Sequence, residues 1–221
     1  MKAPQFLDPH ANIAQHGLRL PHWQQDGATY FVTFRLADSI PANLLEQWRE
    51  ERKTWLRLNP APRSAAQEKA YFARFPRRIE RWLDELHGAC VLRTPKVAMT
   101  VGDVLRRFDG QRYHHHAWVI MPNHVHLLFS LKAGERLERA LQGWKGVSSR
   151  EVRALVPHPG TLWQKDYFDR MIRDTPHFWR CAKYIRRNPA KACLKPGEFL
   201  LFENPHVHET LNGEATPRSP D

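Results

Sequence analysis

The stretch that most constrains the fold of this chain runs from residue 118 to 129, with the sequence WVIMPNHVHLLF. Runs rich in β-branched and aromatic residues flank Met121-Pro122-Asn123, which predicts two strands joined by a tight turn. The second strand opens with His124 and His126, and side chains two residues apart in a strand point to the same face. We therefore expect both imidazoles on one face of a sheet, within reach of one metal ion. The opposite face would be apolar, made by Val125, Leu127 and Phe129.

The periodicity of the remaining chain predicts helices around a small sheet. Extended segments are expected at 30–36, 111–120 and 124–129, and helices at 42–56, 65–86 with a kink at Pro76, 94–108, 135–155 and from Thr175 to Pro189. This order is typical of an α+β sandwich in which a small antiparallel sheet is covered by helices on one face. The open face of that sheet would carry His124 and His126.

The length of 221 residues fits one domain of ordinary size. We predict an N-terminal arm at 1–25, a domain at 26–202 with a helical insert at about 41–108, and a disordered tail at 203–221. The tail is predicted from its Pro, Asn, Glu, Thr and Ser content.

The charge of the chain indicates a polyanionic partner. Lys and Arg number 34 and Asp and Glu 23, so the formal net charge is +11. Nucleic acid is the first candidate and an anionic membrane surface the second. No apolar run is long enough to span a bilayer, and the first residues do not read as a signal peptide, so we expect a cytoplasmic protein without membrane insertion.

Cysteine usage limits the kind of metal site. The three cysteines are far apart in sequence and form no C-x-x-C pair, which argues against a disulfide framework and against a thiolate zinc site. A metal would therefore be held by imidazole and oxygen ligands.

Two groups of basic residues are candidates for nucleic-acid binding. The first lies on a predicted helix and comprises Lys145 and Arg150; the second is the cluster Arg74, Arg77, Arg78 and Arg81. Basic residues on an amphipathic helix are usually a solvated face. The net charge makes a phosphate-facing surface an equally good interpretation.

A candidate nucleophile lies near the end of the last predicted helix. Tyr184 and Asn188 are four residues apart, so they share a helix face. The phenol could attack a phosphate, and the amide oxygen could serve as a third metal ligand. The simpler alternative is a half-buried helix tyrosine. Tyr167, in a segment with Asp166 and Asp169, is a rival.

Three ordered motifs carry a family resemblance. They are Met121-Pro-Asn-His-Val-His-Leu-Leu128, Trp163-Gln-x-x-Tyr-Phe-Asp-Arg-x-Ile-Arg-Asp174 and Tyr184-Ile-x-x-Asn-Pro-x-Lys-Ala-x-Leu194. Together they resemble the REP-associated tyrosine transposases, which are insertion-sequence-200-like single-tyrosine transposases of the HUH class. The resemblance runs from about residue 21 to 202 and implies a ferredoxin-like fold.

The resemblance also implies a chemistry. The HUH pair falls on His124 and His126, the nucleophile on Tyr184, and the polar residue near the metal on Asn188. The expected activity is metal-dependent cleavage and rejoining of single-stranded or hairpin DNA through a 5′-phosphotyrosine, with Mg²⁺ or Mn²⁺ as cofactor. The protein would act as a monomer or a homodimer, on repeated palindromic elements.

Two other function classes stay open from the sequence. A non-catalytic nucleic-acid-binding regulator would keep the fold and bind DNA or RNA without covalent product. A metal-dependent nuclease using water would need His124 but not Tyr184.

Overall fold

The computed structural model describes residues 4–8, 14–16, 22–157 and 160–213 of the chain. The elements in order are β1 (Ala14–His16), β2 (His22–Gln24), β3 (Thr29–Arg35), α1 (Ala42–Leu58), α2 (Ala65–Arg74), α3 (Pro76–Asp84), the 3₁₀ helix η1 (Val91–Arg93), α4 (Pro95–Arg106), β4 (Tyr113–Ile120), β5 (His124–Leu131), α5 (Leu137–Arg153), β6 (Phe168–Met171), α6 (Thr175–Lys191), β7 (Leu200–Glu203) and α7 (Pro205–Gly213). Within these residues no helix is both long and apolar enough to cross a membrane.

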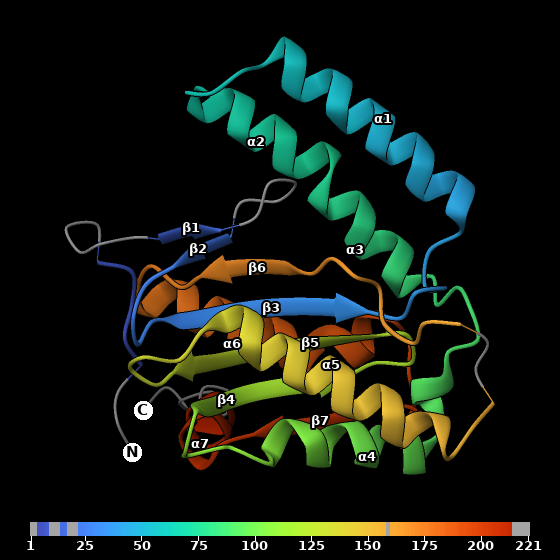
Figure 1. Cartoon of the computed structure of the whole chain (residues 1–221). Helices are drawn as coiled ribbons and strands as arrows, with labels where there is room; N and C mark the ends of the chain where they lie inside the picture. Colours follow the sequence, from blue (N-terminus) through green and yellow to red (C-terminus); the bar gives the residue numbers. More distant parts are fainter. Residues whose placement is uncertain (1–3, 9–13, 17–21, 158–159, 214–221) are drawn as a thin grey trace, which may run out of the picture.

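The central sheet has five strands in the order β6-β3-β5-β4-β7, and every neighbouring pair is antiparallel. The succession β3-α4-β4-β5-α5-β6 within this order is the ferredoxin-like arrangement. β7 extends the sheet beyond it at the β4 edge (Figure 1). The predicted α+β class with an antiparallel sheet is thus confirmed, and the strand with the two histidines lies at its centre.

Helices cover both faces of this sheet (Figure 1). α4 and α5 pack on the face formed by Val125, Leu127 and Phe129, which confirms the alternation expected for β5. α6 packs on the other face, where Leu128 joins an apolar stripe made by Phe178, Cys181, Ala182 and Ile185. The expected open face is therefore absent. Periodicity revealed that α6 is amphipathic, but it did not reveal which side of the sheet α6 would bury.

The helical insert is smaller than predicted. α4 is part of the core and packs on the sheet, so the insert is α1 to α3. α1 and α2 contain no buried residue and extend away from the sheet beyond β6 (Figure 1). α3 returns and buries Trp82 and Leu83 against Ile40. The predicted interruption at Pro76 is confirmed: Pro76 begins α3, where the missing N–H leaves no bond unmade.

Two further elements differ from the prediction. Residues 205–213 of the expected disordered tail form α7, which buries Val207 and Leu211 against the sheet face that α6 covers. The last part of that tail, 214–221, lies outside the described residues. α6 continues through Pro189 to Lys191, because a proline in the last turn removes a single backbone bond.

Candidate active site

The two histidines of β5 form a buried pair. His124 and His126 are 0% and 2% exposed, and their Nε2 atoms are 3.0 Å apart. The ring of Phe31, from the adjacent strand β3, stacks on His126 with a centroid distance of 5.6 Å. Both imidazoles therefore converge through the same ring nitrogen at one point beneath α6.

Hydrogen bonds at the other ring nitrogens orient the pair. Asn123 Oδ1 lies 2.7 Å from His124 Nδ1, and Asn123 Nδ2 donates to the carbonyls of Leu83 and His87 at 3.4 and 3.3 Å. These donations fix the amide orientation, so His124 carries its proton on Nδ1 and offers an Nε2 lone pair. Thr33 Oγ1 lies 2.7 Å from His126 Nδ1 and can donate or accept.

Burial keeps both imidazoles neutral at pH 7. It lowers the pKa of His124 to about 3, and the nearby Lys191 adds to the effect. Burial also lowers the pKa of His126 well below its usual range, helped by His124 and Lys191. Neutral imidazole is the form that binds a metal ion.

α6 brings Tyr184 and Asn188 to the pair. The Tyr184 ring lies edge-on to His126 with a centroid distance of 5.1 Å. Asn188 Nδ2 lies 3.4 Å from His126 Nε2, while the buried Asn188 Oδ1 has no hydrogen-bond partner among the described residues. Asp174 caps the start of this helix by accepting from His177 N at 2.6 Å. The four residues named from the sequence thus meet in one place.

The Tyr184 hydroxyl is protonated at neutral pH. Burial raises the pKa of this phenol far above 10, and the carboxylates of Glu80 and Asp84 on α3 add to the increase. Interaction with the Asn188 side chain lowers the Tyr184 pKa and offsets part of this increase. Tyr184 therefore needs a cation or a proton acceptor close by before it can act as a nucleophile.

The donor set fits a divalent cation that keeps water ligands. Among the described residues there is no group of three or more His, Cys, Asp or Glu side chains suited to a metal, so the protein ligands would be two imidazoles and one amide oxygen. Ligands at right angles on an ion with bonds of about 2.1 Å are about 3.0 Å apart. The observed Nε2 separation is 3.0 Å, and the unpartnered Asn188 Oδ1 supplies the oxygen.

Two of the predicted basic residues, Lys145 and Arg150, are not at this site. Lys145 and Arg150 lie on α5, across the sheet from the histidines. Lys145 Nζ donates to the carbonyls of Gln164 and Lys165 at 2.5 and 2.8 Å, and burial lowers its pKa to about 8. Its ammonium is thus already used to hold the loop before β6.

The four arginines of α2 and α3 differ in how closely acidic side chains hold them. Arg78 is 24% exposed and pairs with Glu51 at 2.6 Å, and Arg74 approaches the same carboxylate at 3.6 Å. Arg81 lies 3.8 Å from Glu85, and Arg77 is exposed. The part of this cluster with most freedom to bind a phosphate is therefore Arg77 and Arg81.

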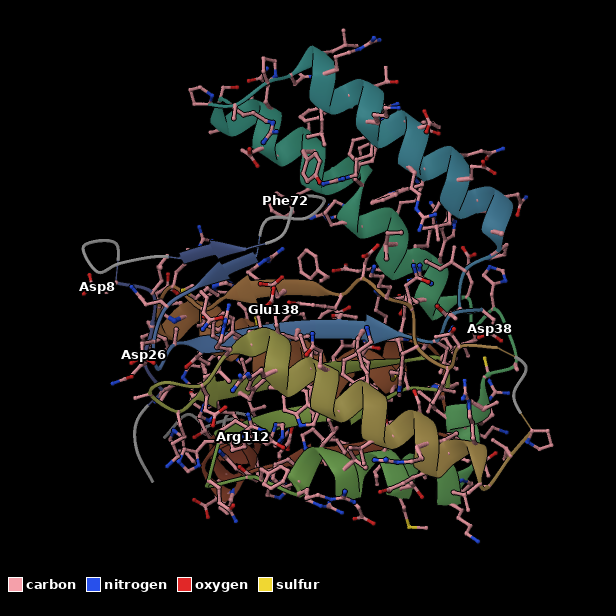
Figure 2. The ribbon with its side chains drawn as sticks, viewed as in Figure 1. Asp8, Asp26, Asp38, Phe72, Arg112 and Glu138 are labelled. Carbon is pink, nitrogen blue, oxygen red and sulfur yellow. The ribbon has the colours of Figure 1, made fainter. Side chains whose placement is uncertain are left out.

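Sequence reasoning missed how the insert supports the site. Leu83 and His87, at the end of α3, hold Asn123 through their carbonyls, and Asp84 pairs with Lys191 of α6 at 2.6 Å. Arg170 of β6 lies 5.1 Å from the centroid of the Phe72 ring, which points from α2 toward the body (Figure 2). No pattern in the sequence pairs residues so distant along the chain.

Tyr167, the rival tyrosine, and the other buried histidines of the sheet have different surroundings. Tyr167 packs against the core on the α4–α5 side of the sheet. His115 and His116 are buried in β4, where their Nε2 atoms lie 2.9 Å from the Leu105 carbonyl and 2.8 Å from Ser130 Oγ. Consecutive histidines of one strand do not converge, as the alternation of side chains predicts.

The site therefore consists of a buried histidine pair on the central strand of a ferredoxin-like sheet, with the helix that carries Tyr184 packed across it. Residues 96–188 match the model of a family described as Transposase IS200 like. That segment runs from α4 to Asn188 and includes all four site residues. The match covers less than half of the chain and shows a similarity to that family over this segment.

Two solved structures are distantly similar. One is a REP-associated tyrosine transposase bound to a REP hairpin, with 15% identity over 79% of this chain and 74% of the other, at a TM-score of 0.40. The second is a protein from Deinococcus radiodurans R1 described as a candidate transposase, with 16% identity over 79% and 98% of the two chains, at a TM-score of 0.39. No curated protein matches the chain significantly. The similarity to the IS200-like transposases therefore comes from the match at 96–188.

Proposed function

We propose that this protein cleaves and rejoins single-stranded or hairpin DNA through a covalent bond to Tyr184, as a transposase of REP-like palindromes. The single observation that carries the proposal is the convergence of four side chains beneath α6. Tyr184 and Asn188 approach His126 from a helix that the fold places over the histidine face of the sheet.

The chain's own residues would perform the following reaction. Tyr184 Oη attacks the scissile phosphorus, the bond from phosphorus to the 3′ oxygen breaks, and the phenol proton finally resides on the released 3′-hydroxyl. The product is a 5′-phosphotyrosine, which retains the phosphodiester energy, so the 3′-hydroxyl can attack it and restore the strand. His124, His126 and Asn188 would hold Mg²⁺ or Mn²⁺, which supplies Lewis acidity to the phosphoryl oxygens.

The experiment follows the two halves of a labelled hairpin. Protein and Mn²⁺ are incubated with hairpin DNA labelled at either the 3′ or the 5′ end, and products are separated on a denaturing gel. We expect the 3′ label to migrate with the protein and the 5′ label to appear on a shorter free strand. EDTA should abolish both products. Tight binding of several hairpins without any cleavage would contradict the proposal and favour a regulator.

A nuclease that uses water is the second candidate. The observation that favours it is the raised pKa of Tyr184, which makes the phenol a weak nucleophile in the surroundings that the structure describes. The same gel separates the two reactions. Water attack would cut the DNA and leave no label on the protein.

Thr33 provides a test of the metal ligands. Thr33→Val preserves side-chain volume but removes the only oxygen that the described residues place at His126 Nδ1. In the ligand form of His126, the proton on Nδ1 would then lack an acceptor. We expect the Mn²⁺ affinity, measured by calorimetry, to fall about 10- to 100-fold. Thr33→Ser keeps the hydroxyl and should stay close to wild type. Equal affinities for all three proteins would show that Thr33 does not support His126 as a metal ligand.

A further inference from the structure

The helix with the nucleophile has an exposed basic stripe. Arg180, Tyr184 and Arg187 are spaced by four and three residues on α6, so their side chains are neighbours on one helix face. Lys191, four residues beyond Arg187, continues the stripe. The side chains of Arg180, Arg187 and Lys191 are exposed, and Tyr184 between them is half-buried.

Among the residues that the structure describes, Arg180 and Arg187 have no acidic partner. Within the part of the chain that the structure describes, neither Arg180 nor Arg187 forms an ion pair or a side-chain hydrogen bond. This distinguishes them from Arg78, which Glu51 holds at 2.6 Å, and from Lys145, which two carbonyls hold. An arginine without a partner keeps its five donors available for an anion.

The two acidic residues near Tyr184 lie close to basic side chains of α3, α6 and β6. Asp84 of α3 is paired with Lys191 at 2.6 Å. Glu80, one turn earlier on α3, lies within the electrostatic influence of Lys191, Arg170 and Arg77. Both carboxylates near Tyr184 thus have basic neighbours, while Arg180 and Arg187 form no ion pair among the described residues.

We infer that Arg180 and Arg187 bind the phosphates on either side of the scissile phosphate, so that the DNA strand runs along α6. The inference rests on the proposed function, because the phosphate at Tyr184 sets the register. At a rise of about 1.5 Å per residue, Arg180 lies about 6 Å before Tyr184 along the helix axis and Arg187 about 4.5 Å after it. The two guanidinium groups would therefore lie on either side of the attacked phosphodiester bond of the DNA. Lys145 and Arg150 cannot do so, because they lie on the opposite face of the sheet.

The test measures the salt dependence of DNA binding with chemistry switched off. All proteins carry Tyr184→Phe and are kept in EDTA, so no strand is cut. Fluorescence anisotropy of a labelled single-stranded oligonucleotide gives the binding constant at several salt concentrations. Each phosphate contact to a single strand contributes about −0.7 to the slope of log K against log salt. The Arg180→Gln, Arg187→Gln double variant should therefore have a slope that is less negative by about 1.4.

Two controls define the outcome. The Arg180→Lys, Arg187→Lys double variant keeps both charges and should keep the slope. Lys96→Gln removes one exposed charge from α4, on the opposite side of the sheet, and should also leave it unchanged. An unchanged slope in the Arg180→Gln, Arg187→Gln variant would overturn the inference. An equal change of slope in Lys96→Gln would also overturn it. Failure of the proposed function would appear separately, as intact Tyr184 yielding no DNA-linked protein.

Discussion

Tyr184→Phe is expected to reduce the yield of DNA-linked protein by three orders of magnitude or more, on the order of what removal of a catalytic nucleophile costs. The substitution removes one oxygen and leaves the ring that packs edge-on to Phe31 and His126 at 5.8 and 5.1 Å. The fold and the DNA affinity should therefore persist. Product is measured as 3′-labelled DNA that migrates with the protein on a denaturing gel.

Tyr167→Phe is the matched control. It removes the same atom from a tyrosine that packs against the α4–α5 side of the sheet. We expect it to form the covalent product at the wild-type level. If Tyr184→Phe still yielded labelled protein, another residue would be the nucleophile. If it still cut DNA without labelling the protein, the reaction would use water.

His126→Ala is expected to remove the response of the protein to Mn²⁺. A ligand that binds the folded state at 100 times its Kd stabilises that state by about 2.7 kcal/mol. For a chain of this length, such a gain raises Tm by roughly 5 to 10 °C. Wild type should show this rise. His126→Ala should not, because the remaining imidazole and Asn188 form an incomplete ligand set, and it should form no covalent product.

His206→Ala serves as the control for removing a histidine. His206 is exposed on α7, where its ring lies 5.5 Å from that of Trp179. This variant should retain both the Mn²⁺-dependent rise in Tm and the cleavage. An equal rise in wild type and His126→Ala would place the metal elsewhere in the protein. Since Tm reports binding and the gel reports chemistry, loss of either can be recognised separately.

Short edge strands were beyond the reach of periodicity. β6 and β7 have four residues each, too few for an alternating pattern to separate them from irregular chain. Backbone pairing with β3 and β4 makes them strands. α7 was missed for a related reason: its polar composition resembles a tail, and burial of Val207 and Leu211 stabilises it.

The sequence by itself determined the face of β5 that holds the histidines and the shared face of Tyr184 and Asn188. It also contained the ordered motifs that resemble those of the IS200-like transposases. These are local properties, because the periods of strand and helix fix which side chains point the same way. Only the tertiary structure decided that α6 covers the histidine face and that α3 supports Asn123. It also decided that the Lys145 ammonium donates to backbone carbonyls. Arg180 and Arg187, in contrast, form no ion pair among the described residues. Such contacts join residues far apart in the chain, and they follow from how the elements bury their apolar faces together.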